Sequence, residues 1–125
     1  MIIGTGVDII EINRVKKAIS KEYFKKRVFT AQEINYCEQK GVQKAASYAA
    51  RFAGKEAVLK ALGTGLIGGR LLDIEILVDE LGAPKVTLTG FFANLAEQKK
   101  VSRIHLSLSH AQLYAVAQVI LEGEI

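Results

Sequence analysis

The sequence has no run of about 18 consecutive apolar residues, the length that a membrane-spanning helix requires. We therefore expect no transmembrane helix and no membrane partner. Residues 1–4 also lack the basic segment that begins a secretory signal peptide. The chain has a single cysteine, Cys37, so an internal disulfide is excluded and a reducing location, the cytoplasm, is expected.

Internal repeats, low-complexity segments and linker-like stretches are absent from the 125 residues. Hydrophobic residues make up 50% of the chain, which is enough to build one compact core. We therefore expect residues 1–125 to form a single domain.

The net charge of +4 is concentrated in one segment. Between Arg14 and Arg27 there are seven basic residues against one acid, Glu22, whereas the other 10 basic and 12 acidic residues nearly balance. At helical spacing, Arg14, Lys17 and Lys21 share the outward side of a first helix, whose apolar residues lie opposite. Such a basic face is often only a solvated surface, but it can also attract an acidic partner.

The central helix expected over residues 42–62 has an acidic residue within its apolar face. At about 100° per residue, Glu56 falls among alanine, phenylalanine and leucine side chains, and Lys60 follows one turn later on nearly the same line. A buried carboxylate is costly unless a cation or metal neutralises it. One interpretation is a Glu56–Lys60 ion pair on a solvated edge. The apolar neighbours favour instead a carboxylate placed for function.

A glycine-rich loop follows this helix. Gly63 is a natural helix cap, and the glycines up to Gly69 can adopt positive φ angles. Such loops can wrap a phosphate with main-chain N–H groups, although a cap followed by a turn uses the same residues. The segment is no Walker A motif, because it leaves a helix instead of entering one. The positive charge that a phosphate needs here could come from Arg51, Lys55, Lys60 and Arg70.

The first strand, residues 1–10, has a second carboxylate. Its alternation places Gly4, Gly6 and Asp8 on one face, and glycines within a strand indicate close approach by a helix or a ligand. Asp8 could merely cap the next helix. Together with Glu56 it offers two oxygen ligands suited to Mg²⁺, with water and phosphate completing the shell.

The remaining pattern predicts an α+β domain. Tyr23, Phe24, Val28 and Phe29 are expected to supply core, and a Thr30–Glu33 capping box opens a short helix that ends at Gly41. The order is β-ααα-ββ-α-ββ, a largely antiparallel sheet packed against helices. Beyond the glycine loop, the predicted elements are strands at 72–76 and 85–89, a helix at 90–100, and strands at 104–110 and 114–121.

Two histidines lie at the ends of the expected strand 104–110. His105 shares a face with Ser107 and Ser109, opposite to His110, so no serine triad is indicated. A histidine in such a place is more often a hydrogen-bonded sheet residue than a catalyst. His110, at the last position, could reach a phosphate or carboxylate from the edge of a site.

Three segments together resemble the holo-acyl-carrier-protein synthases, the small bacterial type of 4′-phosphopantetheinyl transferase. They are residues 4–8 (GTGVD), residues 51–65 (RFAGKEAVLKALGTG), and residues 106–110 (LSLSH) with 114–117 (YAVA). The resemblance covers nearly the whole chain and has the same order of elements. Gly54 departs from it, because Ala or Ser is usual there, at a helix-propensity cost of about 1 kcal/mol.

The resemblance implies Mg²⁺-dependent transfer of phosphopantetheine from coenzyme A to a serine of an acidic acyl carrier protein, with release of adenosine 3′,5′-bisphosphate, in support of fatty acid biosynthesis. Asp8 and Glu56 match the Mg²⁺ ligands, and Lys60 matches the lysine that neutralises or protonates the leaving group. A carboxylate, Glu56 in preference to Asp8, or a water on the metal would take the serine proton. The family is homotrimeric, with sites between subunits. Residues that match the coenzyme A site are Gly63, Thr64, Gly65, Pro84 and His110, with Arg51 and Lys55 near the phosphates.

The alternative is a non-enzymatic module whose basic helix, with Arg14, Lys17 and Lys21, docks an acidic protein or a nucleic acid. Binding of nucleic acid predicts aromatic residues interleaved with the basic ones on an exposed face. Tyr23 and Phe24 neighbour the lysines but are interpreted as core. We therefore expect no nucleic acid partner, and expect the basic helix to bind the carrier protein.

Overall fold

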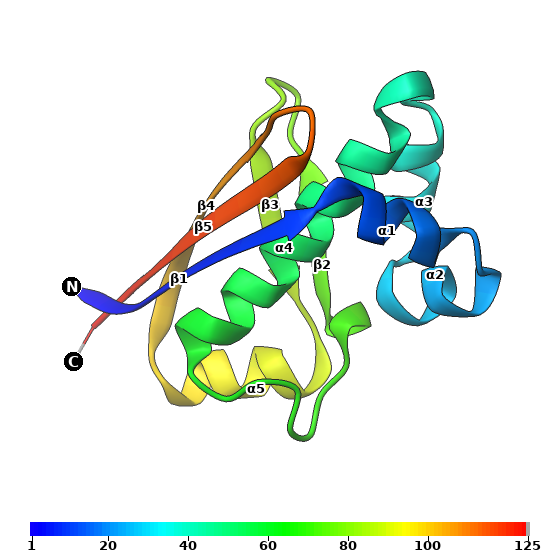
Figure 1. Ribbon diagram of the computed structural model, residues 1–125. Helices are drawn as coiled ribbons and strands as arrows, with labels where there is room; N and C mark the ends of the chain where they lie inside the picture. The colour runs from blue at the N-terminus through cyan, green and yellow to red at the C-terminus, as the bar shows by residue number, and fades with distance from the viewer. Residues whose placement is uncertain (125) are drawn as a thin grey trace.

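The computed structural model describes residues 1–124, and its elements are arranged as in Figure 1. The elements between the amino terminus and the glycine loop are β1 (Ile2–Glu11), α1 (Ile12–Ile19), α2 (Glu22–Val28), α3 (Ala31–Glu38), the 3₁₀ turn η1 (Gly41–Gln43) and α4 (Lys44–Leu62). After the loop follow the 3₁₀ turn η2 (Leu71–Asp73), β2 (Ile74–Val78), β3 (Pro84–Leu88), α5 (Gly90–Gln98), β4 (Val101–His110) and β5 (Tyr114–Gly123).

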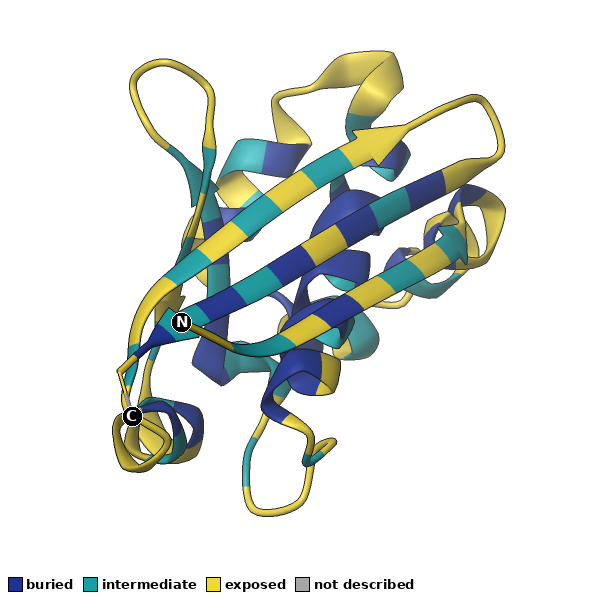
Figure 2. Ribbon diagram, turned by 90° about the vertical axis from the view of Figure 1, so that its left-hand side faces the viewer, coloured by how far each residue is buried: buried dark blue, intermediate teal, exposed yellow. Residues whose placement is uncertain are grey.

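The strands form two antiparallel sheets within the described residues. One has three strands in the order β1-β5-β4, and the other is the β2-β3 hairpin. Helix α4 crosses one face of the three-stranded sheet, while the other face has no helix over it in residues 1–124 (Figures 1 and 2). The predicted class, helices packed against a largely antiparallel sheet, is confirmed.

The number of helices before β2 differs from the prediction, because there are four instead of three. Helix α2 has only seven residues, of which Val28 alone is buried, and its N-cap residue Lys21 makes no side-chain capping bond. A helix this short lacks the repeated apolar spacing and the cap that would reveal it. The same segment corrects the expected core: Tyr23 is 72% exposed, whereas Phe29 is buried.

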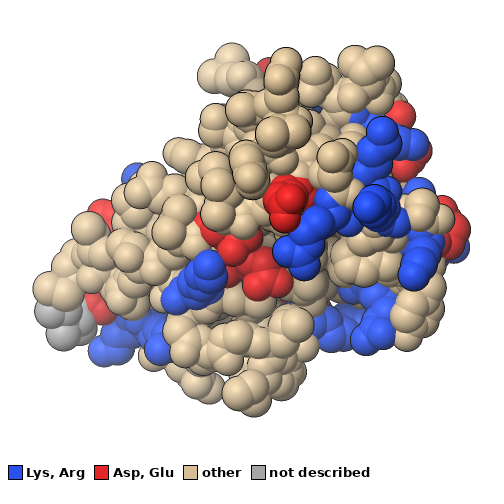
Figure 3. Space-filling view, in the orientation of Figure 1, with Lys and Arg blue, Asp and Glu red and all other residues tan. Residues whose placement is uncertain are grey.

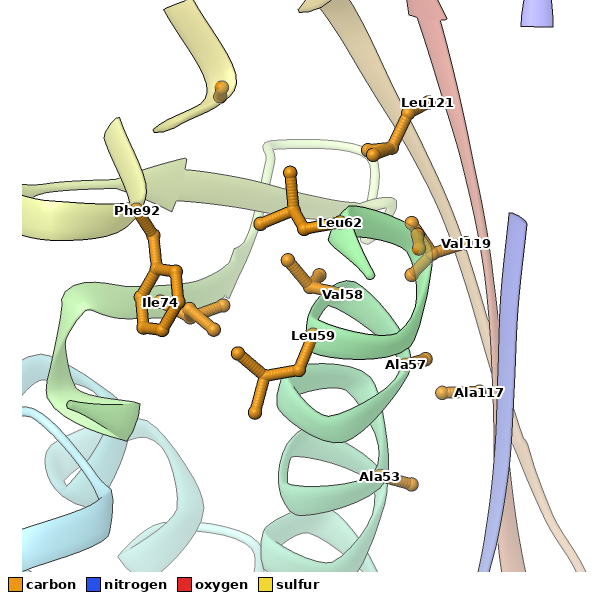
Figure 4. Packing of buried hydrophobic residues seen from close by; sticks show 12 residues of the cluster. Ala53, Ala57, Val58, Leu59, Leu62, Ile74, Phe92, Ala117, Val119 and Leu121 are labelled. Carbon is orange, nitrogen blue, oxygen red and sulfur yellow. The ribbon is translucent and has the colours of Figure 1, made fainter. Parts of the chain in front are cut away.

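Small residues allow α4 to approach the sheet closely. Ala53 and Ala57 on α4 face Ala117 and Val119 on β5, and all four are completely buried (Figure 4). Gly54 continues this surface, because a Cβ atom there would overlap the side chain of Ile76 in the hairpin. Gly54 therefore serves helix–hairpin packing, which offsets its low helix propensity.

The closest contact in this layer is between the main chains of β1 and α4. A Cβ atom on Gly6 would overlap the carbonyl oxygen of Ala57, and one on Gly4 would overlap that of Ala61. The close approach that the glycines predict is therefore made by a helix. Because strand residues alternate between faces, Asp8 lies on the same side of β1 as Gly6, next to the carboxy-terminal half of α4.

Candidate active site

Asp8, Glu56 and Lys60 come together where β1 crosses α4. The Lys60 ammonium donates one hydrogen bond to Oδ1 of Asp8 at 3.0 Å and another to the carbonyl oxygen of Val7 at 3.0 Å. The Lys60 side chain is 55% exposed, whereas that of Asp8 is 16% exposed. Lys60 thus reaches from solvent onto a largely covered carboxylate of the neighbouring strand.

Glu56 lies beside this ion pair, in a position that disfavours its negative charge. Its pKa is raised, first because burial removes water from the carboxylate and second because Asp8 is negatively charged, while Lys60 acts in the opposite direction. Figure 3 shows acidic side chains gathered over the middle of β1 and α4, with basic side chains bordering them. Two carboxylates share one ammonium, so the cluster has room for additional positive charge.

Both structural alternatives for these carboxylates are wrong. Lys60 pairs with Asp8 of β1, and no Glu56–Lys60 ion pair forms within residues 1–124. Asp8 does not cap α1, because the N-cap position belongs to Glu11, which itself makes no side-chain capping bond. Neither carboxylate is therefore explained by local helix stabilisation.

The cluster fits a divalent cation that also binds phosphate. Carboxylate oxygens are the ligands that Mg²⁺ prefers, and Mg²⁺ usually keeps water and substrate oxygens as its remaining ligands. No group of three or more His, Cys, Asp or Glu side chains that could hold a metal occurs in the described part of the chain. The Asp8–Glu56 pair thus suits a shared site better than a closed protein cage.

The glycine loop begins directly after the turn of α4 that carries Lys60. Gly63 has the expected left-handed conformation (φ 81°), and its N–H caps the carbonyls of Leu59 and Lys60. Gly65 and Gly68 also have positive φ, 64° and 86°. The hydroxyl of Thr64, between Gly63 and Gly65, donates a hydrogen bond to the Gly65 carbonyl oxygen at 3.2 Å. The loop is therefore shaped by main-chain geometry that glycine permits.

Pro84 and His110 lie farther from the carboxylates. His110 is opposite Ala115 of β5, on the same sheet face as Asp8 but one strand beyond β5. Two strand spacings, about 10 Å, therefore separate its main chain from that of β1. Pro84 lines a surface depression of about 340 Å³ together with Ile104 and other residues of β4 and β5. A single small group could not contact all of these residues, whereas an extended ligand could.

The expected phosphate contact of Lys55 is contradicted by its position. Its side chain is completely buried, forms an ion pair with Glu33 at 2.8 Å, and donates to the carbonyl oxygens of Leu71 and Ile74. All three ammonium hydrogens are thus used inside the protein. Burial lowers the pKa of Lys55, and the neighbouring Glu33 carboxylate opposes this shift. Lys55 joins α3, α4 and the start of β2.

Arg51 is also buried but keeps unused hydrogen-bond donors. Its guanidinium lies 4.3 Å from the centre of the Tyr36 ring, and Nη1 donates to the carbonyl and hydroxyl oxygens of Ser47. Nε and Nη2 have no hydrogen-bond partner among residues 1–124. The contacts of Arg51 are therefore with Ser47 and Tyr36 and not with the Asp8–Glu56 pair, and its two unpartnered nitrogen atoms are buried.

The remaining predicted residues lie on two other surfaces. His105 forms a hydrogen bond with Glu122 of β5 at 2.9 Å, as expected for a sheet residue. Arg14, Lys17 and Lys21 are all exposed, and the opposite face of α1 is buried as predicted. Lys21, however, lies beyond the end of α1, at the N-cap of α2. The basic face of α1 is therefore free for a partner.

Comparison with known proteins identifies the family. Residues 4–119 match the family model of the 4′-phosphopantetheinyl transferase superfamily. A holo-[acyl-carrier-protein] synthase of Clostridium tetani is 47% identical over 125 residues, which cover 99% of this chain and 98% of the relative.

Solved structures agree over the whole fold. A holo-(acyl-carrier-protein) synthase of Bacillus anthracis, crystallised with CoA (3′,5′-ADP), has 39% identity and a TM-score of 0.82, with 99% of each chain covered. The enzyme of Neisseria meningitidis has 33% identity and a TM-score of 0.89, over 98% of this chain and 99% of that one. Among the helices of residues 1–124, none has the length and apolar character needed to cross a bilayer. The chain belongs to the 4′-phosphopantetheinyl transferase superfamily, among its holo-[acyl-carrier-protein] synthases.

Proposed function

We propose that this protein transfers 4′-phosphopantetheine from coenzyme A to a serine of apo-acyl carrier protein, in an Mg²⁺-dependent reaction that releases adenosine 3′,5′-bisphosphate and serves fatty acid biosynthesis. The observation that carries this proposal is the Asp8–Glu56–Lys60 cluster at the crossing of β1 and α4. Transfer from a pyrophosphate requires positive charge on the phosphates and a group that accepts the serine proton. The cluster offers both kinds of group within one small area.

Each member of the cluster has a distinct task in this proposal. Asp8 and Glu56 would hold Mg²⁺, which when bound neutralises charge on the pyrophosphate oxygens. Lys60 is half-exposed on a flexible stem, so its ammonium can follow the leaving bisphosphate and neutralise or protonate it. A carboxylate, Glu56 in preference to Asp8, or a water on the metal would accept the serine proton.

Coenzyme A would extend from this cluster over the glycine loop. The main chain of Gly63, Thr64 and Gly65 begins directly after the Lys60 turn, which suits contact with the phosphates. Pro84 and His110 lie beyond β5, so they would contact another part of the ligand or the ligand of a neighbouring subunit. Arg51, with two unpartnered but buried nitrogen atoms, remains the candidate for a further phosphate.

The open sheet face supports a homotrimer with sites between subunits. Val7 is 59% exposed and Ile9 is 62% exposed, and both lie on the face of β1 opposite to α4. Exposed apolar side chains on a sheet face are typical of a surface that another chain covers. Light scattering should give the mass of three chains, and Val7→Lys should reduce both this mass and the transfer activity. A monomer with full activity would contradict the trimer and the shared site.

The acidic carrier protein would dock on α1. Arg14 and Lys17 are exposed on α1, and Lys21 is exposed just beyond its end, at the N-cap of α2. Charge of one sign on a single helix face accelerates and orients encounter with a partner of opposite sign. In this proposal coenzyme A binds at the glycine loop and the carrier protein binds at α1.

The test is incubation with coenzyme A, Mg²⁺ and an apo carrier protein, followed by weighing the carrier. The carrier mass should increase by one phosphopantetheinyl group, and chelation of the metal should prevent it. Glu56→Gln should keep the fold, because the side chains are nearly isosteric, and lose transfer; Glu97→Gln on α5 is the matched control. A carrier that binds but is never modified would support the non-enzymatic module, and full activity of Glu56→Gln at limiting Mg²⁺ would refute the metal assignment.

A further inference from the structure

The geometry points to Lys60 as an exchangeable counter-ion of Asp8, which weakens metal binding until phosphate draws the ammonium away. This inference rests on the proposed metal site at Asp8 and Glu56. It concerns the order in which cation and coenzyme A bind, and predicts that the protein without coenzyme A disfavours the cation.

The contacts of Lys60 are those of a group that substitutes for a cation. Its ammonium lies 3.0 Å from Oδ1 of Asp8, the same carboxylate that would bind the metal. A second bond goes to the Val7 carbonyl, also at 3.0 Å, so the position is defined by two acceptors. Because Val7 and Asp8 are consecutive on β1, the ammonium is held against the strand that the metal would also contact.

The same contacts make metal and ammonium competitors. A unit charge about 5 Å from a divalent cation lowers its affinity by about tenfold even at the dielectric constant of water. Asp8 is 16% exposed, so water screens this repulsion less than on an open surface. Lys60 thus satisfies Asp8 and at the same time disfavours a second cation there.

Coenzyme A can relieve this competition. The Lys60 side chain is 55% exposed and carries four methylene groups, so the ammonium can move to a nearby phosphate without a change in the main chain. Asp8 is then free for the cation. By thermodynamic linkage, coenzyme A must tighten metal binding by the same factor as the metal tightens coenzyme A binding.

Calorimetric titration with Mn²⁺ alone, a cation of similar ligand preference, tests the competition. Lys60→Met removes the charge and keeps the length of the side chain; it should bind Mn²⁺ about tenfold more tightly than the wild type. Lys99→Met, at the exposed end of α5, should bind as the wild type does. Unchanged or weaker binding by Lys60→Met would overturn the inference.

Repeating the titration with saturating coenzyme A tests the exchange. The difference in Mn²⁺ affinity between Lys60→Met and the wild type should become smaller, because the wild-type ammonium has then left Asp8. An unchanged difference would overturn the inference. Asp8→Asn and Glu56→Gln separate the two levels of the argument. If they abolish Mn²⁺ binding while Lys60→Met has no effect, the metal site stands and the exchange fails. If they leave Mn²⁺ binding intact, the metal site itself fails, and the exchange with it.

Discussion

Replacement of Lys55 by methionine distinguishes an interior role of this lysine from a role in coenzyme A binding. Methionine fills a similar volume but has no charge and no hydrogen-bond donor. The substitution would leave the Glu33 carboxylate buried without its counter-ion, and the carbonyl oxygens of Leu71 and Ile74 without their donor. Glu33 would keep the N–H groups of Thr30 and Ile76.

The expected loss of stability follows from this arrangement. Breaking a buried ion pair by removing one partner costs about 3–5 kcal/mol, because an uncompensated charge remains in the interior. Since Glu33 keeps two main-chain donors, we expect the lower end of this range, about 3 kcal/mol. For a domain of this size, that corresponds to a fall of about 10 °C in the melting temperature.

Urea denaturation followed by circular dichroism measures the loss. Lys44→Met is the matched control, because Lys44 is on the same helix but is 45% exposed in its pair with Glu38; it should cost about 1 kcal/mol or less. Adding Glu33→Gln to Lys55→Met should recover part of the loss, because no charge is then buried. If Lys55→Met kept wild-type stability but lost coenzyme A affinity, Lys55 would be a phosphate ligand and its interior role would be refuted.

Three further variants test other parts of the structure. Gly6→Ala should lower the stability of the protein in urea and weaken Mn²⁺ binding, because the new Cβ forces β1 away from Ala57. Thr5→Ala, on the exposed face of β1, should have neither effect. A Gly6→Ala protein with wild-type stability and Mn²⁺ affinity would contradict the close contact. The Tyr48 hydroxyl, followed by Lys44 and Lys25, lowers the pKa of Glu38, so its contribution to stability is complete above the ordinary value of 4.5 and is lost as pH falls through the lowered pKa. Tyr48→Phe should therefore flatten the decline in unfolding free energy below about pH 5, and an unchanged pH profile would exclude this role of the hydroxyl. Arg14→Glu with Lys17→Glu should raise the carrier KM and flatten its salt dependence without changing coenzyme A affinity; if coenzyme A binding collapsed instead, the basic face would belong to the nucleotide site.

Features that depend on neighbouring residues could be predicted from the sequence. The Thr30–Glu33 capping box and the left-handed cap at Gly63 are both present, because each needs only a few consecutive residues of the right type. The alternation of β1 likewise identified the side that carries Asp8. The class of the fold and the candidate metal ligands follow from such local signals.

Contacts between distant residues could not be predicted in this way. Lys60 and Asp8 are 52 positions apart, and nothing in either segment shows that α4 lies against β1 rather than another element. Glu33 was recognised as a capping residue, but its second role as the partner of Lys55 depends on the packing of α3 against α4. One signal was present: Lys55 is about 100° from Glu56 around the helix, so the two side chains cannot share a site on one face.

The main-chain contact of β1 with α4 has a consequence for sequence divergence. The close approach of β1 to α4, which brings Asp8 near Glu56, requires two glycines that meet helix carbonyls. Residues elsewhere on α4, such as Val58 and Leu62, pack toward other layers of the protein (Figure 4). They can therefore be exchanged for other apolar residues over evolutionary time, at some cost in stability, while the two carboxylates keep their spacing. Descendants of this chain can keep the arrangement of the two carboxylates through Gly4 and Gly6 even after many of their other interior residues have been substituted.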